Sequence, residues 1–307
     1  MLEAVQGNRQ LVLPLSGGYD SRSILAVLKR LNAKNVVCFS YGDKLNDEVE
    51  ISRKLAESCG FPYYYVEYSK ELCLSLESDR IKYENFAFNF TSLPHVQDFY
   101  AIHKLMSTGK IQVGDIVMPG HSADYSAGTH IPIKSFQKQS FTAKDLYKDL
   151  ISFHLIGSGS KFVSASLKSS LSRFQGSLDF EKYRKEIELF DYKERQSKLT
   201  VNSIRIYDYF GLNAFLPLWD LKLKQQLMSI AGADRKNAEK YREWVIRFCV
   251  ESGIPNLTRN REVREAYISI RNVFNYLKVI FVHKLYTSNI LGNTFLMSYI
   301  SNTFFKL

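Results

Sequence analysis

Several patterns that would classify a chain at once are missing from this sequence of 307 residues. Its four cysteines form no CxxC pair, so neither a zinc ribbon nor a thioredoxin-like motif is present. The opening MLEAVQGNRQ lacks the apolar run of a signal peptide, and no stretch of about 18 uninterrupted apolar residues occurs that would span a membrane. These absences lead us to expect a cytoplasmic protein with free thiols.

Familiar catalytic signatures are missing as well. The sequence contains no GxxxxGK[ST] phosphate loop, no GxSxG nucleophile turn and no HExxH zinc motif. Some histidines stand without a partner at metal-binding spacing, and we interpret them as structural or surface residues: His95, His103, His154 and His283. His130, in the segment GTHIP, is a weaker candidate for chemistry than His121.

Charge is unevenly distributed along the chain. Lys and Arg number 41 against 31 Asp and Glu, a net charge of +10, and the 14 bases and six acids after residue 220 supply +8 of it. No acidic residue follows Glu265. A basic excess favours nucleic acid, an anionic membrane or a phosphate-rich ligand as partner. The hydrophobic content of 45% excludes disorder as the main state, and the length allows one large domain or two smaller ones.

The first half of the sequence alternates between short apolar runs and amphipathic segments. The apolar runs, typical of buried strands, are Gln10–Leu15, Asn35–Tyr41, Pro62–Tyr68 and Asp115–Pro119. Helices are predicted over Ser21–Leu31, Asn46–Cys59 and His95–Ser107. Asp47 and Glu50 have the spacing of a capping box, and Gly60 suits the position after that helix. The alternation predicts an α/β fold with a doubly wound parallel sheet and helices on both faces.

The rest of the chain is predicted to be mainly helical. Residues 136–200 fit a helical insertion or cover within a domain of residues 1–250. The Ser-rich segment 157–177 fits either a mobile connection or the polar turn of a surface helical hairpin, and we favour the hairpin. Residues 251–307 are predicted to form a basic, aromatic helical tail with an apolar stripe. This tail fits packing on the body or on a second copy of the chain, which we favour, and also contact with a membrane surface or RNA.

The sharpest feature is the hexapeptide SGGYDS at residues 16–21, between the first strand and the first helix. Two glycines let the backbone turn tightly and bring its N–H groups close to an anion. The following helix N-terminus points free N–H groups and the positive end of its dipole at the same place, and Ser16 and Ser21 add hydroxyls. Asp20 suits this site if Mg²⁺ bridges it to polyphosphate oxygens. We therefore predict a polyphosphate site here rather than an unliganded turn.

The SGGYDS loop resembles the SGGxDS pyrophosphate loop of the ATP pyrophosphatase, or PP-loop, enzymes. Three later segments narrow the resemblance to asparagine synthetases: PGHSADY (119–125) is similar to SGEGADE, LPLWD (216–220) to RVPFLD, and EKYREWVIR (239–247) to a K-x-x-LR helix. Together they cover residues 11–247 and correspond to the C-terminal synthetase domain of that family. The resemblance implies an adenine nucleotide alpha-hydrolase-like fold. It also implies an ATP-dependent ligase that adenylates a carboxylate, releasing pyrophosphate and AMP, and joins it to nitrogen as an amide.

The resemblance implies roles for individual residues as well. Asp20 and Asp124 would hold Mg²⁺. Lys240 would stabilise the charged transition state, with Lys236 as the alternative, and a solvated helix face is the other interpretation of either lysine. The ATP-binding residues would be Ser16, Gly17, Gly18, Asp20, Ser21, Ser40 and Gly120.

Some residues depart from the family's pattern. His121 replaces a Glu and Tyr125 another, so we expect His121 to bind substrate or act as acid or base rather than hold Mg²⁺, and aspartate is in doubt as the substrate. Arg22 stands where a small residue is commoner, and it fits either an anion-binding residue or a surface arginine. The chain reaches the loop within 20 residues without a glutaminase. We therefore expect nitrogen from ammonia, a separate glutaminase or another nucleophile, unless the chain is a fragment.

Three functions are compatible with these observations. The first, which we favour, is an amide-forming ligase acting on a small carboxylate in surface-polysaccharide or secondary metabolism. The second is a tRNA-modifying PP-loop enzyme, which the basic C-terminal third favours and the PGHSADY and LPLWD segments do not. The third is a catalytically silent module that binds a nucleotide or a partner protein, which the His121 replacement and the weak lysine match favour.

Overall fold

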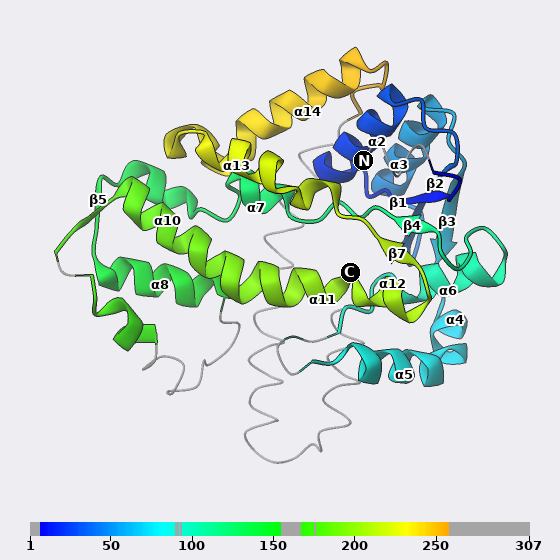
Figure 1. Ribbon diagram of the computed structural model, residues 1–307, viewed down its shortest axis with the longest axis horizontal. Coiled ribbons are helices and arrows are strands. Elements are labelled where there is room, and N and C mark those ends of the chain that lie inside the picture. The colour runs from blue at the N-terminus through cyan, green and yellow to red at the C-terminus, as the bar shows by residue number, and fades with distance from the viewer. Residues whose placement is uncertain (1–6, 90–91, 93, 155–166, 175, 258–307) are drawn as a thin grey trace.

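A computed structural model describes residues 7–89, 92, 94–154, 167–174 and 176–257 of the chain (Figure 1). Its centre is a parallel sheet with the strand order β3-β2-β1-β4-β7. The strands are β1 (Leu11–Pro14), β2 (Val36–Gly42), β3 (Tyr63–Glu67), β4 (Ile116–Val117) and β7 (Asn213–Ala214). Each predicted strand of the first half is present, although β4 keeps only two residues of the predicted Asp115–Pro119.

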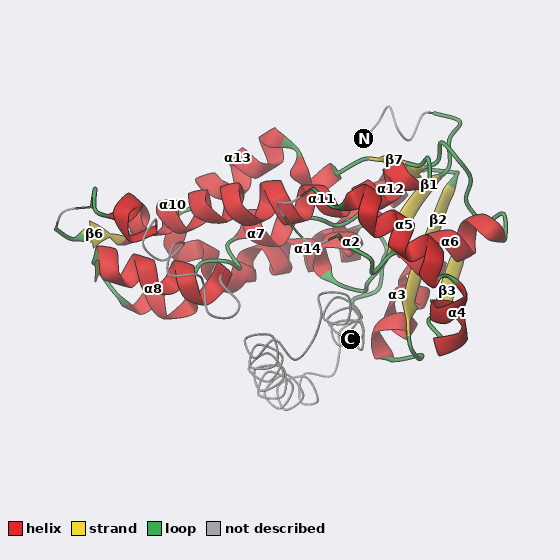
Figure 2. Cartoon of the chain, turned by 90° about the horizontal axis from the view of Figure 1, so that it is seen from below, coloured by secondary structure: helices red, strands yellow, loops and turns green. Residues whose placement is uncertain are grey.

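Helices cover both faces of this sheet because the side chains of each strand alternate between them. Leu11 and Leu13 of β1 pack in one hydrophobic cluster with α2 (Tyr19–Arg30) and α14 (Glu239–Glu251). Val12, between them, packs in a second cluster with helices of the other face. Those helices are α5 (Glu77–Ala87), α6 (Phe99–Ser107) and α12 (Arg205–Tyr209). The predicted doubly wound α/β fold is therefore confirmed, and Figure 2 shows the strands between their helical layers.

Helix α3 (Asp47–Ser58) begins one residue earlier than a capping box at Asp47 would require. The N-cap is Asn46, whose side-chain oxygen accepts hydrogen bonds from the backbone N–H groups of Glu48 and Val49 at 2.9 and 3.1 Å. The predicted Asp47 cap is therefore wrong, because the amide oxygen of Asn46 already satisfies the free donors of the first turn. Helices α4 (Lys70–Ser75) and α5, which follow β3, were not predicted.

The described residues between 133 and 203 build a helical extension beside the sheet, as Figures 1 and 2 show. Its elements are η1 (Ile133–Gln137), β5 (Ser140–Phe141), α8 (Ala143–His154), β6 (Leu178–Asp179), α10 (Phe180–Asp191), the π-helix η2 (Tyr192–Thr200) and α11 (Val201–Ser203). Helices α8 and α10 share a small core of their own, and β5 pairs antiparallel with β6. Residues 157–166 and 175 of the Ser-rich segment lie outside the described residues, so the polar turn of the favoured hairpin stays a prediction.

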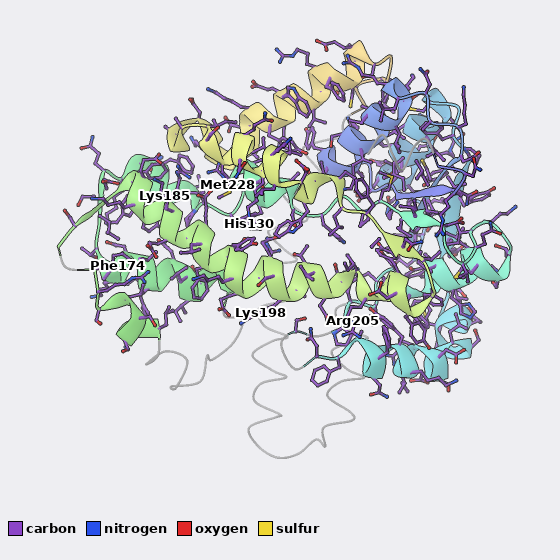
Figure 3. The ribbon with its side chains drawn as sticks, viewed as in Figure 1. His130, Phe174, Lys185, Lys198, Arg205 and Met228 are labelled. Carbon is purple, nitrogen blue, oxygen red and sulfur yellow. The ribbon has the colours of Figure 1, made fainter. Side chains whose placement is uncertain are left out.

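From α10 the chain runs back to the sheet in one helical path. Figure 3 marks this path by Lys185 in α10, Lys198 in η2 and Arg205 in α12. The remaining elements, α7 (Ala123–Ala127), η3 (Pro217–Trp219), α13 (Leu221–Ser229) and η4 (Gly232–Ala238), lead to α14. Within the described parts of the chain, no helix is long and apolar enough to cross a membrane. The contacts predicted for the tail after residue 257 fall outside the described residues.

Candidate active site

The SGGYDS loop leaves β1 and enters α2 through two glycines. Gly17 has φ +67°, and a Cβ on it would lie 3.3 Å from the backbone oxygen of Glu48 and 3.2 Å from Ile51. This left-handed conformation and the close approach to α3 both require glycine. Gly18 is the N-cap of α2, and Ser16 and Ser21 lie with their Oγ atoms 3.3 Å apart. The turn therefore directs the N-terminus of α2 and two hydroxyl groups to one place.

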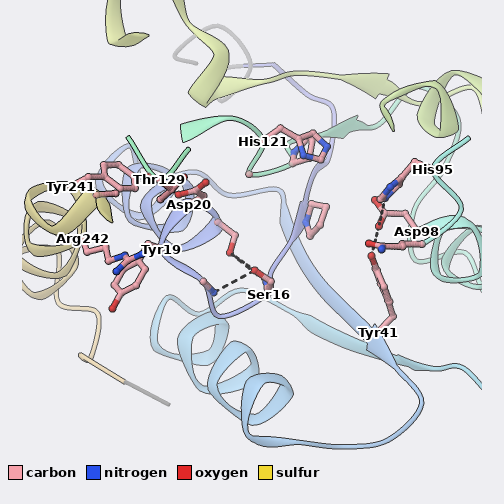
Figure 4. A pocket seen from close by; sticks show the side chains of 17 residues that line it. Ser16, Tyr19, Asp20, Tyr41, His95, Asp98, His121, Thr129, Tyr241 and Arg242 are labelled. Atoms are coloured by element: carbon pink, nitrogen blue, oxygen red, sulfur yellow. Dashed lines mark hydrogen bonds and ion pairs between the residues drawn. The ribbon is translucent and has the colours of Figure 1, made fainter. Parts of the chain in front are cut away.

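A cavity of about 400 Å³ opens beside this loop, at the carboxyl ends of β1 and β4. Figure 4 shows the loop on one side of it and Tyr41, His95 and Asp98 on the other. The side chains or backbones that line it come from Pro14, Ser16, Gly18, Tyr19, Asp20, Ser21, Tyr41, His95, Gln97, Asp98, Pro119, Gly120, His121, Thr129, Ala238, Tyr241 and Arg242. Of the residues predicted to bind ATP, all except Gly17 and Ser40 are in this set. The Ser40 hydroxyl instead pairs with that of Tyr63.

The second predicted motif packs directly on the first. A Cβ at Gly120 would lie 2.9 Å from the backbone nitrogen of Ser21, so the two segments touch through their backbones. The next residue, His121, lies in the cavity wall, and its Nε2 is 3.3 Å from the hydroxyl of Ser203 in α11. Ser122 has φ +76° and donates from its hydroxyl to Gln196 in η2 at 2.9 Å. Contacts with η2 and α11 therefore hold the second motif in position.

Asp20 lies in the loop, where a Mg²⁺–polyphosphate site would need a carboxylate. Its carboxylate lines the cavity next to the loop and accepts a hydrogen bond of 3.0 Å from the hydroxyl of Tyr241. Mg²⁺ in such sites is held by one or two carboxylates together with phosphate oxygens. In the part of the chain that the structure describes, no three His, Cys, Asp or Glu side chains gather to hold a metal. The second predicted ligand, Asp124, belongs to α7, and its side chain lies outside the described residues.

Comparison with known proteins agrees with this geometry. The family model described as asparagine synthase matches residues 3–280, which include the loop, the second motif and α14. The chain belongs to the asparagine synthase family. It is therefore related to ATP-dependent amidation domains, and the match includes every described residue. A search of curated proteins finds no match.

Within this asparagine synthase-family site, Arg22 takes neither of its two predicted positions. It is only 4% exposed, so it is not a surface arginine, and it does not line the cavity. Its guanidinium donates a hydrogen bond of 2.8 Å to the backbone oxygen of Gly17. Arg22 therefore stabilises the loop from its buried side, through a charged hydrogen bond to the Gly17 backbone.

The two predicted lysines do not contribute to the cavity wall. Lys240 is 58% exposed and forms an ion pair of 2.6 Å with Asp234. Lys236 lies at a kink within η4, and neither lysine lines the cavity. Arg242, two residues after Lys240, does line the cavity. The basic residue of α14 that faces the cavity is thus Arg242, whereas the K-x-x-LR resemblance implied a lysine.

The far side of the cavity contains residues that the sequence analysis missed. Asp98 is 7% exposed and accepts hydrogen bonds from the hydroxyls of Tyr41 and Tyr207 at 2.5 and 2.7 Å. His95, interpreted from the sequence as a structural or surface residue, lies 3.8 Å from the same carboxylate and lines the cavity. Burial raises the pKa of Asp98, but the nearby His95 and the two phenols outweigh it and hold this pKa below its usual value. The spacing of His95 and Asp98, three residues apart, was the available signal.

The third family segment, LPLWD, has a structural role. Asp220 is the N-cap of α13, and its carboxylate accepts a hydrogen bond of 2.9 Å from the backbone N–H of Leu223. Pro217 begins the short helix η3, where its missing N–H costs no hydrogen bond. Neither residue lines the cavity. The match at this segment therefore reflects how the chain turns into α13.

Proposed function

We propose that the chain is an ATP-dependent amide-bond synthetase that activates a small carboxylate by adenylation. A carboxylate oxygen attacks the α-phosphorus of ATP, and pyrophosphate leaves. Ammonia or an amine then attacks the acyl carbon and loses a proton, and AMP leaves. The observation that carries this proposal is the backbone contact between the SGGYDS loop and Gly120, which joins a polyphosphate cradle and the second family motif in one cavity.

The loop residues would bind the phosphates that leave. Ser16 and Ser21 would donate from their hydroxyls, and the N-terminal N–H groups of α2 would contribute the positive end of the helix. Asp20 and Asp124 would hold Mg²⁺, which, when bound, spreads the negative charge that develops on the leaving group. The Tyr241 hydroxyl supports this role, since its hydrogen bond fixes the orientation of the Asp20 carboxylate.

His121 would serve the acyl end of the reaction. It follows Gly120 in the cavity wall and replaces the family's Glu, so a group that titrates near neutral pH stands where a carboxylate is usual. We assign it the proton that the attacking nitrogen loses. The same replacement supports a substrate other than aspartate, such as a sugar carboxylate or another small acid of surface-polysaccharide or secondary metabolism. Free ammonia or a separate glutaminase would supply the nitrogen.

The test is a turnover assay with ATP, Mg²⁺, ammonia and a panel of small carboxylates. We expect one or more acids to give pyrophosphate and AMP in equal amounts, and Asp20→Ala to abolish both products. Asp43→Ala, which changes an exposed acid at the end of β2, is the matched control and should retain the activity. Product formation only after addition of tRNA, or ATP binding without any pyrophosphate, would contradict the proposal.

A further inference from the structure

Helix α14 meets the SGGYDS loop through two pairs of adjacent residues. The Tyr241 hydroxyl donates to Asp20 at 3.0 Å, and the Arg242 guanidinium carbon lies 5.8 Å from the centre of the Tyr19 ring. Figure 4 shows both pairs at the same end of the cavity. Consecutive residues of the helix therefore contact consecutive residues of the loop, and Tyr19, the variable position of SGGxDS, is the one that faces Arg242.

From this arrangement we infer that Arg242 supplies the positive charge that binds the nucleotide phosphates, and that Tyr19 positions it. Arg242 is the one Lys or Arg among the described residues that line the cavity. Its guanidinium is in cation–π range of Tyr19 and donates to the side chain of Asn237 at 3.4 Å, and within the described residues it forms no ion pair with a carboxylate. The planar fork of an arginine suits the oxygens of a phosphate group.

The backbone before α14 explains why Arg242 faces the loop instead of Lys240. Asn237 and Ala238 both have left-handed conformations, with φ +50° and +53°, immediately before the first turn of the helix. Two such residues in succession turn the chain sharply and set the rotation of α14. Lys240 is thereby directed to Asp234, where it is 58% exposed. The site consequently has an arginine where the family resemblance implied a lysine.

The inference rests on the proposed function only in identifying the ligand as a polyphosphate. Its test is calorimetric titration of the full chain with Mg²⁺–pyrophosphate and with MgATP, because binding needs no acceptor acid. A charged hydrogen bond contributes about 1.5–3 kcal/mol, so Arg242→Ala should weaken both ligands about 10- to 100-fold. Arg242→Lys should fall between Arg242→Ala and the unchanged chain. Arg247→Ala is the matched control, since Arg247 lies on the same helix and is 72% exposed.

Variants of Tyr19 test the positioning role. Tyr19→Phe keeps the aromatic face and should bind pyrophosphate as the unchanged chain does. Tyr19→Leu should bind about threefold more weakly, the size of an exposed cation–π contact. In the Arg242→Ala background, Tyr19→Leu should cause no further loss, because the two residues act together. A loss in Tyr19→Phe, or additive losses, would assign Tyr19 a different role.

Each further outcome decides between the two proposals. Unchanged binding in Arg242→Ala, or a loss in Lys240→Ala equal to that of Arg242→Ala, overturns the inference and leaves the proposed function standing. Polyphosphate binding that depends on Arg242, without any product from the acid panel, supports the inference and overturns the amide-forming activity. Failure of the unchanged chain to bind either polyphosphate overturns both. Circular dichroism of each variant confirms that a loss of affinity is not a loss of the fold.

Discussion

The contact between Gly120 and the start of α2 gives the most direct structural prediction. In the Gly120→Ala variant the new methyl carbon would stand 2.9 Å from the backbone nitrogen of Ser21 and 3.3 Å from Asp20. Real Cβ atoms do not approach a backbone atom so closely, and no side-chain rotation can relieve the clash. The second motif must therefore move away from the loop, and it takes His121 with it.

Overpacking of this kind costs about 1–3 kcal/mol, and we expect the free energy of unfolding to fall by that amount. The displacement also disturbs the N–H groups at the start of α2, so MgATP affinity should fall about tenfold, which corresponds to the loss of about one charged hydrogen bond. Urea unfolding measures the first effect and calorimetric titration the second. Both effects have the same cause and should appear together.

Gly42→Ala is the control for the effect of adding a methyl group. Gly42 ends β2. A Cβ added there would lie 3.5 Å from its nearest neighbour, the hydroxyl of Tyr65, which is an ordinary van der Waals distance. This variant should stay within about 0.5 kcal/mol of the unchanged chain and bind MgATP equally well. The reasoning would be refuted by a Gly120→Ala variant that matches the unchanged chain in both stability and affinity.

Three further predictions concern residues that line the same cavity or lie next to its wall. Ser122→Gly should change stability by less than about 1 kcal/mol, because relief of the left-handed backbone offsets the lost bond to Gln196, whereas Ser122→Ala should lose about 1–2 kcal/mol in urea unfolding. Because the pKa of Asp98 is lower in the folded chain, its carboxylate stabilises the fold at pH values above its unfolded pKa of about 3.9, and this stabilisation is lost as the pH falls. The free energy of unfolding should therefore decline less steeply between about pH 5 and 2 in Asp98→Asn than in the unchanged chain. Tyr241→Phe removes the hydrogen bond that orients the Asp20 carboxylate and should raise the Mg²⁺ concentration needed for half-maximal pyrophosphate release.

The parts of the fold that the sequence predicted well are those set by local pattern. Buried parallel strands appear as continuous apolar runs, because helices cover both faces, and this located β1, β2 and β3 within one or two residues. The SGGYDS loop was recognisable because its glycines, serines and aspartate stand at fixed offsets between a strand and a helix. Of its two glycines, Gly17 has the left-handed φ that favours glycine, whereas Gly18 has an extended backbone.

The features that the sequence did not indicate depend on contacts between distant segments. Lys240 and Arg242 lie two residues apart on one helix, and the choice between them depends on the left-handed turn at Asn237 and Ala238. An Asn-Ala pair indicates a left-handed backbone less clearly than glycine would. Asp98 was missed for a similar reason. Its partners Tyr41 and Tyr207 come from β2 and α12, and no local sequence pattern indicates that their hydroxyls meet at one carboxylate.

The charge of the cavity explains why the basic composition was a poor guide to the site. The described residues that line the cavity include one arginine, Arg242, and two acids, Asp20 and Asp98, although the whole chain has a net charge of +10. Most of the surplus lies after residue 220, and Lys240, one of its members, is directed to Asp234 outside the cavity. A polyphosphate in this cavity would therefore be held by oriented N–H groups, one arginine and a metal ion, not by a general positive field. Such a site selects a ligand by geometry, which a count of charges along the sequence does not measure.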